Sequence, residues 1–467
     1  MPEPLNIDTK GNITIKINLW SFLKVCLILA IAFASSYVPL NGLTPSSKFC
    51  LMLFVAAAGF WISEVIPAFA TAIMVIVLSI YIFGWPGGML HFDQTGYRIF
   101  LNPIASPVLV LFFGGFVLAA AATKHGLDVR LARAFIKPFG THPQMVLLGI
   151  ILTTGLFSMF MSNTATTAMM IAILTPLLRN FKGRDPFKKA MVLSVPFAAN
   201  VGGIGTIIGT PPNAVAASVL TGIGQPISFL KWMLIGTPLA FTLLFILWIV
   251  LIKIFKPKED HFEVLFPEPL MLTWDLVIVV LTFSVTILLW LTEPLNGIPA
   301  PVVALLPIMI FTMFGIIDQH DLKKLDWDAL ILVAGGLTLG VTMNSSGLSN
   351  VLVNQFSFFH LSPFLLLMII VLFSTMVSNF MSNTSAANLI IPLVTSMAVI
   401  NPKMGAIAVA FACSVAMSLP ISTPPNAIAF ATHAIETKDM AKYGTLFSLI
   451  SVICIYFVLF VLHLVWL

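Results

Sequence analysis

The sequence predicts an all-α polytopic membrane protein of about eleven transmembrane helices and two re-entrant hairpins. Of its 467 residues, 59% are hydrophobic and only 9% are charged, whereas a soluble domain carries roughly 25% charged residues. The apolar residues form runs near the roughly 20 that a helix needs to cross a bilayer. The two halves of the chain also repeat one pattern of apolar and polar segments.

The spans are expected to be helices. The runs lack the alternation that barrel strands show over about ten residues, and backbone groups in lipid must satisfy their own hydrogen bonds. The net charge of +5 mostly records the orientation of the loops in a membrane protein. The bilayer is therefore an expected partner, and nucleic acid is not.

Residues 1–40 are interpreted as an N-terminal tail and a first transmembrane helix. Lys16 and Lys24 precede an apolar stretch ending in AFASS, which resembles a secretory signal with a small-residue cleavage site. The stretch at residues 19–38 is long enough to span. We therefore expect a first helix that is retained.

Residues 45–255 form the first of two predicted repeats. Basic residues on one face of residues 127–139 and apolar residues on the other predict a helix in the membrane interface. Apolar runs predict spans at residues 49–64, 68–84, 105–123 and 232–254.

Two apolar segments of the first repeat are interrupted. Residues 145–178 are too long for one span and carry Ser-Asn-Thr at 162–164, which predicts a re-entrant hairpin with its tip at these three residues. Residues 191–222 contain GGIGTIIGTPPN, whose glycines and prolines do not fit a continuous helix. This second segment is therefore predicted to be a span that unwinds at its middle.

After a polar linker at residues 256–273, expected in the cytoplasm, residues 274–467 repeat the plan. MSNT recurs, and GTPPNAVA is matched by STPPNAIA. Blocks recurring in one order, with offsets of roughly 210 to 230 residues, predict an internal duplication. The second hairpin is expected at residues 362–400 and the second broken helix at residues 403–433. The matching blocks are 66–76 and 298–308, 109–127 and 330–348, 161–164 and 381–384, and 209–216 and 422–429.

Lysine and arginine are unevenly distributed around the hairpins. They flank the first hairpin on both sides, which marks the cytoplasmic face, but residues 349–402 contain none. The second hairpin is therefore expected to open toward the opposite face, so that the repeats are inverted. This scheme places the N-terminus in the cytoplasm and the C-terminus outside the plasma (inner) membrane. Inverted repeats with broken helices are typical of secondary transporters, which bind substrate near the bilayer midplane.

The repeated Ser-Asn-Thr phrase places oxygen atoms at each hairpin tip. A serine stands four residues before each phrase, Ser158 before Ser162 and Ser378 before Ser382, on the same helical face. Unpaired carbonyl groups at a tip suit a small hard cation, and unpaired N–H groups suit an anion. Such residues also serve helix packing, but their repetition at both tips favours binding.

The middle of the predicted core helices contains no Lys or Arg to pair with an anion and no Asp or Glu to carry a proton. A multiply charged anion at this depth is costly unless other charges neutralise it. We therefore expect cations to be transported together with an anion. Two repeats predict at least two cation sites.

Paired SNT phrases with paired TPPN breaks resemble the divalent anion/sodium symporter family, the carriers of dicarboxylates, citrate and sulfate. CSVAMSLPISTPPNAIA, residues 413–429, is similar to that family's C-terminal signature, with Met417 where the family usually has Phe. The resemblance covers nearly the whole chain after the first helix. It implies a homodimer in which a transport portion, holding both hairpins and both broken helices, moves past a fixed scaffold like an elevator.

The resemblance also implies site residues. The first sodium site would use Ser158, Ser162, Asn163 and the carbonyl of Gly209. The second would use Ser378, Ser382, Asn383 and the carbonyl of Ser422. Substrate carboxylates would meet Asn163, Thr164, Asn383 and Thr384, in a pocket lined by Thr210, Pro211, Thr423 and Pro424.

Two intact SNT phrases favour a C4 or C5 dicarboxylate, such as succinate, malate, fumarate or 2-oxoglutarate, transported with sodium ions. A sodium-independent dicarboxylate/dicarboxylate antiporter, or citrate or sulfate as the preferred anion, stays possible. A membrane-embedded hydrolase needs a nucleophile with a base or a metal cluster, and no His, Asp or Glu lies near either phrase in sequence. We therefore expect no enzyme activity and no catalytic residue.

Overall fold

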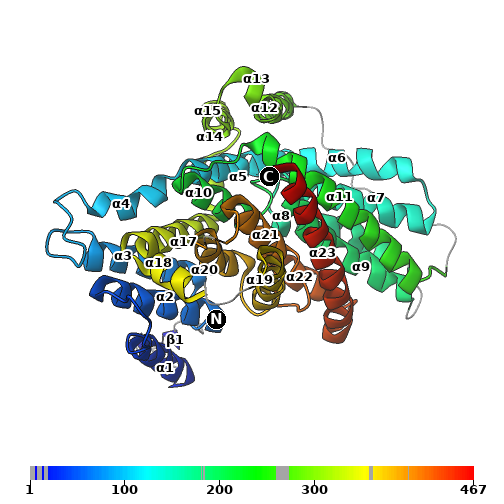
Figure 1. Cartoon of the computed structure of the whole chain (residues 1–467). Helices are drawn as coiled ribbons and strands as arrows, with labels where there is room; N and C mark the ends of the chain where they lie inside the picture. Colours follow the sequence, from blue (N-terminus) through cyan, green and yellow to red (C-terminus); the bar gives the residue numbers. More distant parts are fainter. Residues whose placement is uncertain are drawn as a thin grey trace.

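A computed structural model of the chain describes residues 6–7, 13–14, 19–179, 181, 185–258, 273–356, 361–397 and 399–466. Most of the predicted tail before residue 19 and most of the linker at 256–273 lie outside the described residues. A two-residue antiparallel pair, β1 (Asn6–Ile7) with β2 (Ile13–Thr14), precedes the first helix. All other described elements are helices (Figure 1).

The helices of the first half follow the predicted order. In sequence, they are α1 (Leu19–Ser35), α2 (Pro45–Ser63), α3 (Ala68–Phe83), α4 (Tyr97–Leu101), η1 (Asn102–Ala105), α5 (Pro107–Lys124), α6 (Leu127–Ile136), η2 (Lys137–Phe139), α7 (Pro143–Ser158), α8 (Asn163–Arg179), α9 (Pro186–Gly202), η3 (Gly203–Gly205), α10 (Pro211–Gly222) and α11 (Phe229–Ile254).

The second half presents a corresponding series after α11. It consists of α12 (Trp274–Leu291), α13 (Glu293–Asn296), α14 (Ala300–Val303), α15 (Leu305–Met313), α16 (Gln319–Lys323), α17 (Trp327–Ser345), α18 (Leu348–Phe356), α19 (Pro363–Ser378), α20 (Asn383–Thr395), α21 (Pro402–Ser414), α22 (Pro424–Phe430) and α23 (Thr437–Trp466).

Proline defines the start of matching helices in the two halves. It is the first residue of α7 and α19, of α9 and α21, and of α10 and α22. This position suits proline, because the first helical N–H has no partner inside the helix and the fixed φ of the ring is already helical. The residues between α9 and α10 and those between α21 and α22 are called here the first unwound segment (203–210) and the second unwound segment (415–423).

Eleven candidate spans result when each broken helix is counted as one. Six apolar stretches reach spanning length among the described residues: α2, Tyr97–Lys124, α11, α12, α17 and Thr437–Leu464. Three shorter apolar stretches, α1, α3 and Ala300–Met313, add to the two broken helices α9–α10 and α21–α22. The chain is thus an all-α polytopic membrane protein, as the sequence predicts.

The two halves pack into one another rather than side by side. Helix α10 of the first half contacts α20 and α21 of the second, and α22 of the second half contacts α8 and α9 of the first. Helix α17 packs on α3, and α5 packs on α14 and α15. Figure 1 shows α19 to α22 near the centre of the molecule, with α12 to α15 at one edge. Each hairpin therefore lies against the broken helix of the other half.

Two lysines of the first half form ion pairs with the second half. Lys189 of α9 lies 2.7 Å from Asp439 of α23. Lys124 of α5 lies 2.5 Å from Asp321 of α16 and 3.7 Å from Asp318. Partly exposed pairs contribute little to stability. These pairs join segments that the distribution of Lys and Arg assigns to the cytoplasmic side.

Two features differ from the sequence prediction. Helix α18 is the second-half counterpart of α6, although only the first of these two helices is predicted. The segment of the second half that corresponds to α3 forms two helices, α14 and α15, instead of one. Pro307 interrupts it, because proline lacks an N–H and its ring clashes with the carbonyl four residues earlier. That residue is Val303, where α14 ends.

Candidate functional site

Both hairpins break at the Ser-Asn-Thr phrase. Helix α7 ends at Ser158 and α8 begins at Asn163, while α19 ends at Ser378 and α20 begins at Asn383. The Ser158 hydroxyl lies 2.5 Å from Asn163 Oδ1, and the Ser378 hydroxyl donates to Asn383 Oδ1 at 2.7 Å. The same side-chain pair therefore closes both tips.

The other predicted serines of the tips cap helices. Ser162 Oγ accepts a hydrogen bond from the N–H of Ala165, and Ser382 Oγ accepts one from the N–H of Ser385, each at 3.2 Å. A serine before the first helical residue commonly satisfies one of the N–H groups that the helix leaves free. Ser162 and Ser382 thus fix the start of α8 and α20.

The first unwound segment closes over the tip of the first hairpin. A Cβ atom added to Gly203 would lie 2.8 Å from Asn163 Oδ1 and 3.0 Å from the carbonyl oxygen of Gly209. A Cβ atom added to Gly209 would collide with the Gly203 carbonyl and lie 2.9 Å from that of Ser158. Glycine permits this close approach of backbone groups. The carbonyls of Gly203, Gly209 and Ser158 and the side chain of Asn163 therefore lie close together, and sequence reasoning identified all of these residues except Gly203.

The side-chain amide of Asn163 is surrounded by oxygen atoms. With its nitrogen turned toward them, the amide donates to the carbonyls of Ala199 at 3.2 Å and Gly209 at 3.1 Å and to Ser158 Oγ at 2.5 Å. With its oxygen turned toward them, acceptor oxygens face one another. The two orientations of an asparagine amide are distinguished by the groups around it. The contacts favour the first orientation, in which the Asn163 nitrogen donates to all three oxygens, whereas in the second only the Ser158 hydroxyl can donate to the Asn163 oxygen.

The tip of the second hairpin has a similar but not identical surrounding. The Ser378 hydroxyl is also 3.1 Å from the carbonyl of Cys413. Ser422, the counterpart of Gly209, donates through its hydroxyl to the carbonyl of Asn379 at 3.0 Å, and Asn379 Oδ1 accepts from the N–H of Ser418 at 2.8 Å. Asn379 therefore joins the second hairpin to the second unwound segment, a role that the sequence analysis missed.

The predicted substrate residues differ in exposure. Thr164 and Pro424 are exposed, Pro211 is half-buried, and Thr210, Thr384 and Thr423 are buried. Thr423 caps α22 by accepting from the N–H of Asn426 at 3.3 Å, whereas Thr210 makes no side-chain cap. Of these six residues, Thr164 in the first SNT phrase and Pro424 in the second TPPN motif are therefore the most accessible to a ligand.

The asparagine of each TPPN motif holds an unwound segment in place. Asn213 Nδ2 donates to the carbonyls of Gly203 at 2.9 Å and Thr206 at 2.7 Å. Asn426 Nδ2 donates to those of Met417 at 3.1 Å and Leu419 at 2.9 Å. Both side chains are fully buried. Sequence reasoning identified the motif but assigned no role to these two residues.

Replacing Asn426 by leucine is expected to destabilise the protein, because the buried carbonyl of Met417 and the half-buried carbonyl of Leu419 lose their donor. An unsatisfied buried group costs about 1–3 kcal/mol. Thermal unfolding in detergent measures the effect as a lower midpoint. Asn350→Leu on the exposed surface of α18 is the control and should leave the midpoint nearly unchanged. Equal midpoints for the two variants would show that the hydrogen bonds of Asn426 contribute nothing to stability.

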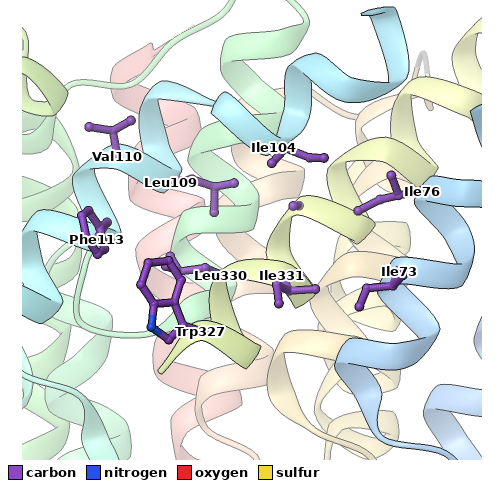
Figure 2. A pocket seen from close by; sticks show the side chains of 10 residues that line it. Ile73, Ile76, Ile104, Leu109, Val110, Phe113, Trp327, Leu330 and Ile331 are labelled. Atoms are coloured by element: carbon purple, nitrogen blue, oxygen red, sulfur yellow. The ribbon is translucent and has the colours of Figure 1, made fainter. Parts of the chain in front are cut away.

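A cavity of about 450 Å³ lies outside these motifs, between α3, η1, α5 and α17 (Figure 2). Ile73, Ile104, Phe113 and Trp327 contribute to a lining that is apolar throughout. Such a lining offers no partner to a carboxylate. This cavity is therefore not a binding site for an anion.

Comparison with known proteins identifies the family. Residues 18–467 match the model of the sodium:sulfate symporter transmembrane region. The chain is 30% identical to the sodium-dependent dicarboxylate transporter SdcS of Staphylococcus saprophyticus, over 90% of this chain and 87% of that protein. It is also 30% identical to SdcS of Staphylococcus aureus, over 88% of this chain and 85% of that protein.

Two solved structures share the fold. One is the YdaH transporter of Alcanivorax borkumensis, with a TM-score of 0.60 and 12% identity over 85% of this chain and 98% of that one. The other is MtrF of Neisseria gonorrhoeae, with a TM-score of 0.55 and 11% identity over 91% of this chain and 96% of that one. The match of the family model to nearly the whole chain, together with the relatives, shows that this protein belongs to the sodium:sulfate symporter transmembrane family.

Proposed function

We propose that this protein is a secondary transporter that carries C4 or C5 dicarboxylates across the membrane together with sodium ions. The observation that carries the proposal is the close approach of neutral oxygens at the first tip, from the Ser158 hydroxyl, the Asn163 side chain and the carbonyls of Gly203 and Gly209. Hard cations prefer such oxygen ligands. The relatives named above are sodium-dependent dicarboxylate transporters, which supports the same assignment.

At the proposed first sodium site, the ligands are Ser158, Ser162, Asn163 and the carbonyl of Gly209. We add the carbonyl of Gly203, because it lies beside Gly209 and accepts a hydrogen bond from the Asn213 side chain that holds it there. A sodium ion would be stabilised by the Asn163 oxygen and the backbone carbonyls. Without the ion, the Asn163 amide can turn and donate to the same oxygens.

The second proposed site has the same plan. Its ligands are Ser378, Ser382, Asn383 and the carbonyl of Ser422, and the Ser378–Asn383 contact repeats that of Ser158 with Asn163. The N-terminal ends of α8 and α20 carry unpaired N–H groups and a partial positive charge, which suit a carboxylate. Asn163, Thr164, Asn383 and Thr384 lie at these ends, and Thr210, Pro211, Thr423 and Pro424 begin α10 and α22.

The proposed transport cycle uses the two halves as inverted repeats. Each broken helix contacts the hairpin of the other half, which supports movement of both hairpins and both broken helices as one unit. We propose that this unit moves like an elevator within a homodimer. The proposed orientation places the N-terminus in the cytoplasm and the C-terminus outside the plasma (inner) membrane.

Uptake of labelled succinate into proteoliposomes tests the proposed function. An inward sodium gradient is expected to drive accumulation into vesicles that contain no dicarboxylate, because the bound cations neutralise the anion on its way through the membrane. Vesicles with equal sodium on both sides are the control. Uptake that ignores sodium but requires internal dicarboxylate would establish an antiporter instead. Stronger competition by citrate or sulfate than by unlabelled succinate would change the assigned substrate.

A further inference from the structure

Asn200 connects the two halves of the chain. It is fully buried in α9, next to the first unwound segment. Its Nδ2 lies 3.2 Å from Thr423 Oγ1 and 3.5 Å from Asn426 Oδ1. The side chain therefore crosses from the first half of the chain to the TPPN motif of the second.

The backbone beside Asn200 belongs to the surroundings of the first proposed site. The carbonyl of Ala199, the preceding residue, lies 3.2 Å from the side-chain amide of Asn163. When the Asn163 nitrogen faces this carbonyl, it donates to it. When a cation draws the Asn163 oxygen inward, the Ala199 carbonyl loses that donor. The orientation of the Asn163 amide therefore sets whether the Ala199 carbonyl, next to Asn200, has this donor.

The side chain of Asn200 acts on the groups that shape the second proposed site. Thr423, which it contacts, caps α22, and Asn426 holds the carbonyls of Met417 and Leu419 in the second unwound segment. Ser422, whose carbonyl is a proposed ligand, lies in that segment. A displacement of the Asn200 amide therefore changes the restraint on the second site.

Asn200 of the first half contacts the TPPN motif of the second half, but among the described hydrogen bonds none runs from the matching position of the second half to the TPPN motif of the first. When the two TPPN motifs are aligned, the position of Asn200 is occupied by Cys413 in the second half. The carbonyl of Cys413 accepts from Ser378 of its own half. The hydrogen bond from Asn200 to Thr423 thus runs only from the first half to the TPPN motif of the second.

We propose that Asn200 couples the two sodium sites, so that sodium binding at one favours binding at the other. This inference rests on the proposed function. Coupling between two sites is reciprocal, and its physical basis here is the Asn163–Ala199 contact on one side and the Asn200–Thr423 bond on the other. Asn200 is a positioning residue, because it acts through these neighbours.

The test compares the unaltered full-length protein with Asn200→Leu, a side chain of similar size without the donor. The Hill coefficient is measured from equilibrium binding of radiolabelled sodium to the purified protein without substrate, with ionic strength held constant by choline chloride, and succinate uptake at saturating sodium is measured separately. The unaltered protein is expected to give a Hill coefficient well above one. Asn200→Leu is expected to bring it close to one, while uptake at saturating sodium changes by less than about threefold.

Asn388→Leu is the matched control. Asn388 is also fully buried, donates one hydrogen bond to the Leu332 carbonyl and has an unpartnered Oδ1, but its contact stays within the second half. It should lower the melting temperature and leave the Hill coefficient unchanged. If Asn200→Leu does not fold, Asn200→Ser replaces it, because its hydroxyl ends one atom short of the Thr423 contact.

The outcomes separate the two proposals. Sodium dependence with the same Hill coefficient in the Asn200 variants and the unaltered protein would overturn the coupling alone. Absence of any sodium dependence in the unaltered protein would overturn the proposed function and the coupling with it. A Hill coefficient lowered equally by Asn388→Leu would show a general structural effect and also overturn the coupling.

Discussion

Replacing Asn163 by alanine is expected to abolish sodium-driven succinate uptake. The variant removes the side-chain oxygen that faces Ser158, Ala199 and Gly209. An interaction with a charged group contributes about 1.5–3 kcal/mol, which corresponds to roughly a 10- to 100-fold loss of apparent sodium affinity. Asn383→Ala removes the matching oxygen at the second tip, and the same loss is expected there.

Sodium titrations of uptake and of thermal stabilisation measure the effect of these two alanine variants. Stabilisation by a ligand depends on its concentration relative to its dissociation constant, so the stabilisation curve should move to higher sodium. Folding and dimerisation should be intact by size-exclusion chromatography. Asn350→Ala, on the exposed surface of α18, is the control. Uptake retained in both Asn163→Ala and Asn383→Ala would refute the assignment of the sites.

Gly203→Ala is expected to reduce sodium-driven succinate uptake about as strongly as Asn163→Ala does. The reason is the volume of the added methyl group. The new methyl group would stand 2.8 Å from Asn163 Oδ1 and 3.0 Å from the Gly209 carbonyl, inside the space where the proposed sodium ion is held. The backbone of Gly203 is helical, with φ of −54°, so alanine causes no strain of its own. We expect uptake to fall on the order of 100-fold, because overpacking costs about 1–3 kcal/mol and a ligand is displaced as well.

Gly222→Ala is the matched control for this effect. Gly222 ends α10, and an added Cβ meets no atom within 4 Å. Succinate uptake and sodium affinity should therefore equal those of the unaltered protein. Normal sodium affinity in Gly203→Ala would exclude the space beside Gly203 as a cation site.

The sequence alone located the breaks in the helices. The Ser-Asn-Thr phrases lie where α8 and α20 begin, and the TPPN motifs lie where α10 and α22 begin, because serine caps and first-turn prolines act on neighbouring residues. These are local effects, so they can be read from short stretches of chain. The second amphipathic helix, α18, escaped prediction because it has no basic residues to mark its polar face.

The sequence by itself determined that this protein is a helical membrane protein in which the SNT and TPPN motifs each occur twice, and which residues form its tips. Only the tertiary structure decided which atoms meet there. Asn200 and Thr423 are 223 residues apart, and Gly203 approaches Asn163 from a different helix. Such contacts depend on how the halves pack into one another, whereas caps and helix breaks depend on residues a few positions away. The repeated motifs and the family resemblance that they carry therefore predicted the proposed ligands, but not the residues that hold them together.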